Sequence, residues 1–141
     1  MTYLPHHNFI PQHLTVKRVF DDFEIDFKEF EVHFPELSSH SHFKIANLSG
    51  GQRRLIEVYM IVKSKSQFSM LDEPFSHLMP LPVEKMNELL HVEKEKKGFL
   101  ITDHLFQHVV ALSHNLYVLK DGKTHFTKNQ NDLAKLGYAR P

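Results

Sequence analysis

The amino-acid sequence predicts an α/β fold in which helices are layered against a mainly parallel sheet. Two short apolar segments, residues 67–71 and 99–102, indicate strands, because each stops abruptly at polar residues. An amphipathic helix is predicted between them, over residues 82–97, and a further helix from about 104 to 112. Strands that alternate with helices are typical of βαβ units, whose strands run parallel.

The composition is that of one globular domain. Of the 141 residues, 41% are apolar and 24% are charged, which excludes a wholly disordered chain and a collagen-like fibre. The 17 Lys and Arg residues balance the 17 Asp and Glu residues, so we do not expect binding of nucleic acid through a basic face. Because the chain has no cysteine, disulfides and thiolate metal sites are excluded.

The sequence predicts no segment that inserts into a membrane. Residues 1–9 lack the apolar run of a signal peptide. The longest apolar stretch, residues 55–62, is interrupted by Glu57 and falls far below the roughly 20 residues of a spanning helix. We therefore expect a cytoplasmic chain that reaches a membrane only through partner subunits.

The first half of the chain is predicted to be mainly helical. Residues 3–10 are expected to form a loop, and apolar residues at three- and four-residue spacing predict a helix from Thr15. Apolar residues continue through an acidic segment that ends at Pro35, and residues 38–42 are expected to form a loop. A strong helix is predicted to begin at Ser49, with one apolar face formed by Leu55, Val58, Tyr59 and Val62.

The second half is predicted to end in a hairpin and a short helix. Gly98 is expected to cap the C-terminus of the helix over 82–97. Residues 116–119 and 124–127 flank a turn sequence that strongly favours a hairpin, Lys120-Asp121-Gly122-Lys123. Residues 129–136 predict a short helix, with Asn129 or Asn131 as its cap.

Twelve histidines raise the question of a metal site. The pairs considered are His6/His7, His40/His42 and His104/His108. The last pair has the i, i+4 spacing of a zinc-protease helix but lacks that helix's glutamate. Surface or loop histidines are the better interpretation.

Three clusters carry candidate chemistry, and the first is the segment 48–54. It holds Gly50 and Gly51 directly before a helix, so the backbone can approach a ligand closely and free amides can face phosphate oxygens. Taken alone, the same segment is better explained as a glycine loop whose Ser49 caps the helix.

The other two clusters follow the two predicted strands. Asp72 and Glu73 would lie at the carboxyl edge of the parallel sheet, where α/β proteins bind ligands, and could serve Mg²⁺ and an attacking water. The alternative is an ordinary junction of strand and turn, stopped by Pro74. His104 would lie at the same edge, where it either contacts a phosphate or caps the next helix.

Taken together and in order, these segments make the chain similar to the C-terminal part of an ATP-binding cassette (ABC) ATPase. The residues that carry the resemblance are the signature Leu48-Ser49-Gly50-Gly51-Gln52, the Walker B strand Met70-Leu71-Asp72-Glu73-Pro74, the D-loop start Ser76-His77-Leu78, and His104 as the switch histidine. Residues 117–123 also resemble the final strand and turn of that domain. The resemblance implies a P-loop NTPase-like three-layer fold that is incomplete at the N-terminus, with a helical signature subdomain over about 12–66 and a core part over about 67–141.

The resemblance also implies roles and partners. Two cassettes dimerise head to tail around two ATP molecules, so Ser49, Gly50 and Gly51 would face the γ-phosphate held by the opposite subunit. Asp72 would assist Mg²⁺, Glu73 would act as the general base for water, and His104 would steady the γ-phosphate. The chain would be the ATP-hydrolysing subunit of a transporter, bound to a second ATPase subunit and to a membrane-spanning subunit.

The sequence departs from the family at several positions. It contains no Walker A motif G-x-x-x-x-G-K-[ST], since Gly122-Lys123-Thr124 lies in a hairpin after a strand. His6 stands where the Q-loop glutamine is expected, with Gln12 as a minor alternative, and Met79 replaces the D-loop aspartate.

These departures predict a truncated or degenerate cassette that binds ATP and Mg²⁺ weakly by itself. The alternative is a non-catalytic regulatory or structural partner that offers its signature face to a complete cassette. Because the P-loop strand is missing, we also expect strand 67–71 or strand 99–102 to have an unpaired apolar edge.

Overall fold

The computed structural model describes residues 1–127 and 130–137. They belong to two units, Met1–Phe106 and Gln107–Pro141. The first unit holds all the candidate site residues that the sequence predicts, from His6 to His104.

A three-stranded parallel sheet forms the centre of the first unit. Its strands are β1 (Thr2–Leu4), β2 (Phe68–Asp72) and β3 (Gly98–Thr102), in the order β1-β2-β3. The register aligns Tyr3 with Met70 and Met70 with Leu100. The predicted α/β fold with parallel strands is therefore confirmed.

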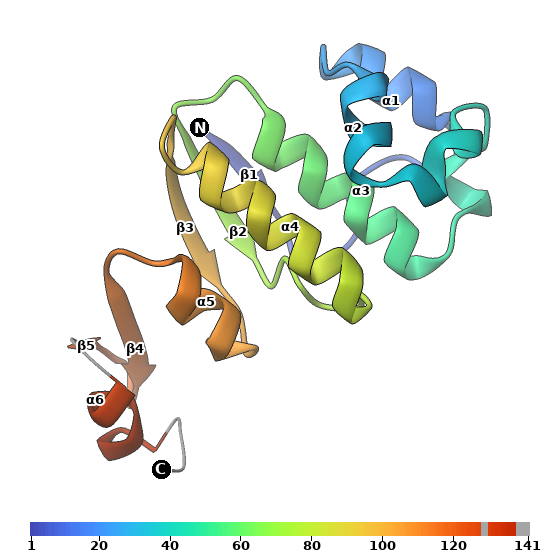
Figure 1. Ribbon diagram of the computed structural model, residues 1–141. Helices are drawn as coiled ribbons and strands as arrows, with labels where there is room; N and C mark the ends of the chain where they lie inside the picture. The colour runs from blue at the N-terminus through green and yellow to red at the C-terminus, as the bar shows by residue number, and fades with distance from the viewer. Residues whose placement is uncertain (128–129, 138–141) are drawn as a thin grey trace. The chain divides into compact units, whose positions relative to one another are not determined.

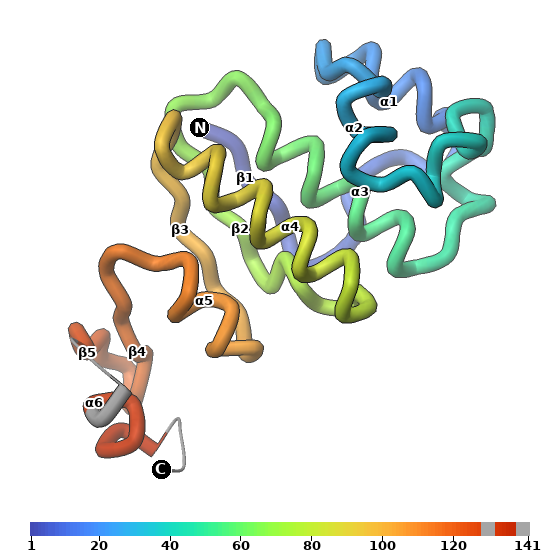
Figure 2. The backbone as a smooth tube through the Cα atoms, viewed as in Figure 1, coloured from blue at the N-terminus to red at the C-terminus, as the bar shows by residue number. Residues whose placement is uncertain are grey.

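Strand β1 corrects the expectation of a loop over 3–10. Three residues are too few to show the alternation that identifies a strand, and the pairing depends on β2, more than 60 residues later. Figure 2 shows the N-terminal segment beside β2. Leu4 is fully buried, which adds an apolar contribution to the pairing.

Helices α3 (Gly50–Lys63) and α4 (Pro80–Glu93) cover one face of this sheet (Figure 1). The helix predicted from Ser49 is confirmed, and its buried stretch runs from Arg54 to Val62. Helix α4 begins two residues earlier than predicted, because Pro80 occupies its first turn, where a missing N–H costs nothing.

The C-terminal boundary of α4 was predicted wrongly. The helix ends at Glu93 with Lys94 as its cap, and Gly98 instead begins β3. A Cβ at Gly98 would lie 2.7 Å from Cδ2 of Phe68. The structural reason for glycine there is therefore a close approach of the Phe68 ring rather than a helix end.

Short helices pack beside α3, away from the sheet (Figure 1). They are α1 (Val16–Asp22), α2 (Phe27–His33) and two 3-10 helices, η1 (Pro35–His40) and η2 (Ile45–Asn47). Thr15 and Asp26 cap α1 and α2 with their side chains. The loop expected over 38–42 is thus partly helical, because η1 continues as far as His40.

An aromatic cluster joins these helices to α3. Phe30 is fully buried, and its ring centroid lies 5.1 Å from Phe20, 5.1 Å from Phe34 and 4.9 Å from Tyr59. Phe27 adds an edge-on contact with Phe20 at 4.9 Å. Aromatic pairs at such separations add stability beyond the burial of their area.

We expect Tyr59→Phe to leave the free energy of unfolding unchanged or to raise it by up to about 1 kcal/mol. The Tyr59 hydroxyl is buried within this cluster and has no hydrogen-bond partner among the residues that the structure describes, and burial raises the pKa of the phenol. Removing the oxygen removes the cost of its desolvation and keeps the ring. Urea unfolding of both proteins checks this; a loss above about 1 kcal/mol, the worth of a typical hydrogen bond, would reveal a partner for the hydroxyl.

The second unit contains the predicted hairpin, β4 (Leu116–Lys120) and β5 (Lys123–Thr127). Its turn residues Asp121 and Gly122 both have positive φ, which is the geometry of a type I′ turn. Helix α6 (Gln130–Lys135) follows, while Asn129, one of its two expected caps, lies outside the described residues. Helix α5 (Phe106–Leu112) begins two residues later than predicted, so His104 lies before it.

Of the two strands for which an unpaired edge was the alternative expectation, β3 has one. Strand β2 is paired on both sides, whereas β3, within the described residues, pairs with β2 alone.

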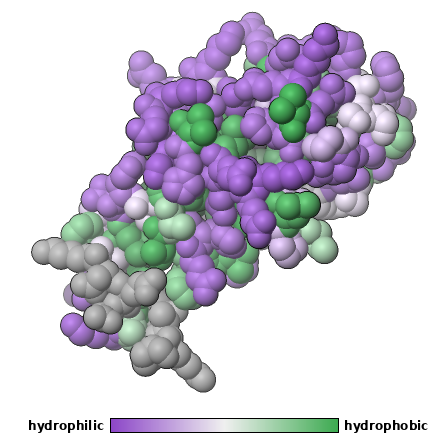
Figure 3. All heavy atoms as spheres, in the orientation of Figure 1, coloured by the Kyte–Doolittle hydropathy of each residue, from purple (hydrophilic) through white to green (hydrophobic). Residues whose placement is uncertain are grey.

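In the orientation of Figure 3 the visible surface is mostly hydrophilic, with separate hydrophobic residues. Among the described residues no helix combines the length and the apolarity needed to cross a membrane.

Candidate functional site

The candidate site begins at the carboxyl end of β2. Asp72 Oδ1 accepts a hydrogen bond from the Thr102 hydroxyl at 2.7 Å, and Oδ2 accepts one from the Tyr3 hydroxyl at 3.3 Å. Residues of both neighbouring strands therefore hold this carboxylate. Its oxygens are ligands of the kind that Mg²⁺ prefers, so the residue type and position fit the predicted assistance to the metal ion.

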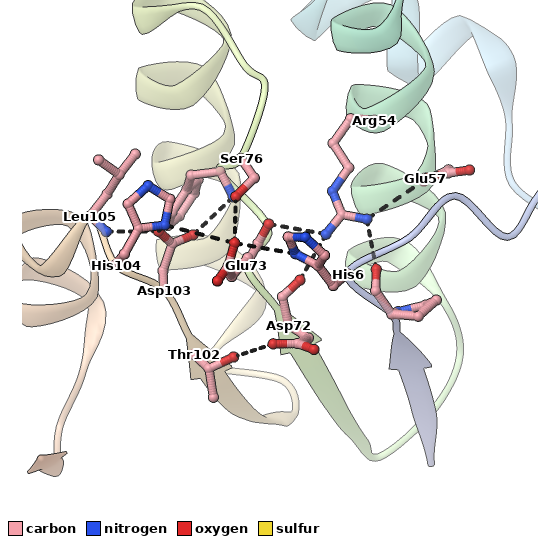
Figure 4. A network of polar contacts seen from close by, with 12 residues as sticks. His6, Arg54, Glu57, Asp72, Glu73, Ser76, Thr102, Asp103, His104 and Leu105 are labelled. Atoms are coloured by element: carbon pink, nitrogen blue, oxygen red, sulfur yellow. Dashed lines mark hydrogen bonds and ion pairs between the residues drawn. The ribbon is translucent and has the colours of Figure 1, made fainter. Parts of the chain in front are cut away.

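Three further side chains lie close to one carboxylate oxygen of Glu73, Oε2 (Figure 4). The Ser76 hydroxyl donates to it at 2.9 Å, Nδ1 of His6 lies at 3.2 Å, and Nδ1 of His104 lies at 3.7 Å. The Glu73 side chain is 34% exposed, so a water molecule or ligand can reach it. The structure thus brings together four residues that the sequence placed in separate motifs.

The backbone at Glu73 has an unusual conformation. Its φ is 47°, in the left-handed region that residues other than glycine rarely adopt. Such a conformation persists when surrounding contacts determine it, and it is common at functional sites. Here the Glu73 N–H donates to the Thr102 carbonyl at 2.8 Å.

Asp103 is a site residue whose role the sequence did not reveal. Its buried carboxylate accepts the N–H of Phe75 at 3.1 Å and the N–H of Leu105 at 2.8 Å. Its Oδ1 also lies 3.6 Å from Nδ1 of His104. Asp103 therefore connects the loop after β2 to the loop after β3. In the sequence, the feature that could have identified it is a carboxylate directly after a predicted strand.

Arg54 and Glu57 were also missed as parts of the site. Both are buried on α3, with Arg54 Nη1 3.8 Å from Glu57 Oε2. The Arg54 guanidinium donates to three backbone carbonyls, those of Pro5, Asp72 and Glu73. Burial lowers the pKa of Arg54 and raises that of Glu57. The one feature of the sequence that could have identified Arg54 and Glu57 is that they are charged residues within a mainly apolar helical stretch.

The signature segment starts α3. Ser49 is the cap, and its hydroxyl accepts the Gln52 N–H at 3.2 Å while the Gln52 side chain accepts the Ser49 N–H at 2.9 Å. This is a capping box, so the local structural interpretation of Ser49 is correct. Ser49 and Gly50 remain exposed to a ligand, and Leu48 precedes them at the end of η2.

The D-loop segment lies against this helix start. A Cβ added at Gly51 would meet the backbone carbonyl oxygen of His77 at 3.0 Å, whereas one at Gly50 would meet nothing within 4 Å. His77 has φ of 65°, and the Leu78 N–H donates to the Phe75 carbonyl at 3.3 Å. The two family motifs are therefore neighbours in this structure.

We expect Gly50→Ala to stabilise the chain by up to about 1 kcal/mol and Gly51→Ala to gain less or to destabilise it. Both changes add helix propensity, but only the second pushes a methyl group against the His77 backbone. Thermal or urea unfolding of the two variants checks this difference. Equal gains would mean that the two segments are not in contact.

Two further positions that the sequence singled out are Gln12 and Met79. The backbone carbonyl of Gln12, the alternative Q-loop residue, accepts the Ala46 N–H at 3.0 Å, and Met79 is the exposed residue before α4. His104 precedes α5, so it shares no helix with His108. Among the described residues no group of three or more histidines and carboxylates is arranged to hold a metal ion.

Comparison with known proteins finds relatives over part of the chain. The lipopolysaccharide export system ATP-binding protein LptB of Acidithiobacillus ferridurans is 35% identical over 78 residues, and LptB of Escherichia coli K12 is 32% identical over 77. Over about half its length, the chain is homologous to ATP-binding proteins of ABC transporters. A match to the Caenorhabditis elegans ABC transporter ced-7 covers 77% of this chain, at 30% identity, but only 6% of that protein.

The similarity covers only part of the known ABC proteins. The chain spans 32% of the length of both LptB relatives, and no family model matches it. Solved structures agree on the ABC fold: an ATP-binding subunit of an ABC transporter has a TM-score of 0.74 at 18% identity, with 96% of this chain and 62% of that chain covered. The RNase-L inhibitor has a TM-score of 0.75 at 18% identity, with 96% and 30% covered.

Proposed function

We propose that this chain is part of an ATP-binding subunit of an ABC-type transporter, in which ATP hydrolysis is coupled to transport. The observation that carries the proposal is the environment of Glu73, a partly exposed carboxylate next to Asp72 at the sheet edge, with His104 beside it. We assign residues 12–66 to a helical signature subdomain and 67–141 to part of the ATPase core.

In the proposed reaction Glu73 holds and deprotonates the attacking water, and His104 orients that water and the γ-phosphate. Asp72 holds Mg²⁺ or its water ligands. Bound Mg-ATP would supply the reacting phosphoryl group and the metal charge that neutralises it. Phosphoryl transfer depends mainly on positioning and charge neutralisation. The contacts of Ser76 and His6 with Glu73 support the positioning of this carboxylate.

The signature face would act on a nucleotide held by another subunit. Ser49, Gly50 and Gly51 would face the γ-phosphate across a head-to-tail dimer, with a membrane-spanning subunit as the further partner. The chain would then lie at the cytoplasmic side of the membrane. These 141 residues contain no Walker A motif, so we expect the chain alone to bind Mg-ATP weakly.

Mixing this chain with a complete cognate cassette tests the proposal. One composite site could form, from the phosphate-binding loop of the cassette and the signature face of this chain. Ser49→Arg should abolish any stimulation of ATP hydrolysis, because a bulky cation replaces a small hydroxyl at the γ-phosphate. Glu73→Gln should matter far less, because it serves a nucleotide that the chain by itself scarcely holds.

The pattern of effects separates the candidate functions. Loss with Ser49→Arg and retention with Glu73→Gln mean that the chain acts through its signature face. Loss with Glu73→Gln alone means that its own carboxylates are the active ones and that the action in trans is wrong. If neither variant changes hydrolysis that the chain does stimulate, both proposed roles are refuted.

A further inference from the structure

The contact between His6 and Glu73 is too weak to fix the positions of the two residues by itself. The two residues belong to segments far apart in sequence, and their side chains are 57% and 34% exposed. Exposed pairs of charged or polar groups contribute little, because water screens them and holding two side chains costs entropy. The 3.2 Å separation therefore depends on how the two backbones are held.

One buried side chain holds both backbones. Arg54, 2% exposed, donates from Nη1 to the Pro5 carbonyl at 2.7 Å, and Pro5 directly precedes His6. From Nη2 it donates to the Asp72 carbonyl at 2.7 Å and the Glu73 carbonyl at 3.0 Å. Figure 4 shows the guanidinium between the two segments.

The same contacts explain the conformation of Glu73. A positive φ at this residue is energetically unfavourable and must be determined by its surroundings. A planar guanidinium binds neighbouring carbonyls in a fixed fork, which a lysine ammonium cannot reproduce. Glu57, 3.8 Å away and equally buried, balances the positive charge.

We propose that Arg54 is the positioning residue of the His6–Glu73 pair: it fixes the backbone that presents each side chain to the other. Its importance for catalysis rests on the function proposed for Glu73, whereas the positioning itself does not. The resemblance implies no role for this position, since the signature motif ends at Gln52 and the next motif begins at Met70.

The chain contains a matched control at the preceding position. Arg53 also lies on α3 and also fastens the segment after β1, through a 2.6 Å bond from Nη2 to the Ile10 carbonyl. Its Nε donates a hydrogen bond to Oε1 of Glu57 at 3.4 Å. Arg53 therefore contacts Ile10 and Glu57, whereas the carbonyls of Asp72 and Glu73 accept hydrogen bonds from Arg54.

The test follows the His6 ring by NMR in the 141-residue chain, with the resonance assigned from the His6→Ala variant. We expect Glu73→Gln to shift the His6 ring signals in the wild-type background and in Arg53→Met. In Arg54→Met the same substitution should produce less than about half of that shift, because the coupling between the two sites needs the guanidinium. Arg54→Lys should not restore it.

Circular dichroism establishes that each variant is folded. If Arg54→Met does not fold, Arg54→Lys carries the test, because it keeps the charge and the aliphatic stem. A wild-type-sized shift in a folded Arg54 variant, or no shift in the wild-type background, overturns the positioning role. The measurement needs no nucleotide, so it is independent of the mixed-cassette experiment that decides the proposed function.

Discussion

Replacing Phe30 by alanine is expected to lower the free energy of unfolding by about 3–5 kcal/mol. Phe30 is fully buried on α2, and its ring contacts those of Phe20, Phe34 and Tyr59. Its loss removes the transfer energy of a whole ring and leaves a cavity that stiff aromatic neighbours cannot fill. Urea unfolding followed by circular dichroism measures the difference.

Val32→Ala is the control for this prediction. Val32 lies on the same short helix but is 80% exposed, so its truncation should change stability by less than about 0.5 kcal/mol. If Phe30→Ala costs no more than Val32→Ala, the aromatic cluster does not hold α2 against α3. Because alanine has a higher helix propensity than valine, a large cost for Val32→Ala would instead indicate that the Val32 side chain is packed against a neighbour.

Sequence reasoning succeeded where one segment carries its own signal. The capped, periodic helix from Ser49, the apolar strands before Asp72 and after Lys97, and the hairpin around Gly122 all follow from local patterns. It failed at β1, which has three residues and exists only as a partner of β2. It also failed at Gly98, whose reason is a ring on the neighbouring strand.

The candidate site shows the same division. The acids after β2 and His104 were identified because strand ends are visible in sequence. The geometry that unites them depends on Arg54 and Asp103, whose partners are backbone groups on other segments. Composition and spacing cannot show which carbonyl a buried guanidinium will find, so their roles emerged only in three dimensions.

We expect the purified 141-residue chain to self-associate through the sheet face opposite α3 and α4, and Leu100→Lys to suppress this association. Tyr3, Met70 and Leu100 are cross-strand neighbours on that face, and Leu100 is 48% exposed. They line a shallow groove, together with Leu71, Asp72 and Thr102. Contiguous exposed apolar residues of this kind mark interaction sites or aggregation surfaces.

The position of β3 strengthens this expectation. Within the described part of the chain it pairs with β2 alone, so its free backbone groups lie beside the apolar face, and an unpaired edge invites another strand. Lysine at position 100 would place a charge on the apolar face and at the middle of the edge strand, and charged residues on edge strands are a device by which proteins prevent such pairing.

Sedimentation velocity over a range of concentrations measures the effect, and Val92→Lys is its control, since Val92 is exposed on α4 instead. Wild type and Val92→Lys should show concentration-dependent association, whereas Leu100→Lys should sediment as a monomer. If Leu100→Lys associates as strongly as the other two, the contact lies elsewhere on the molecule. A wild-type chain that is monomeric at every concentration would contradict the prediction. It would show that the exposed apolar face and the unpaired edge of β3 do not cause association.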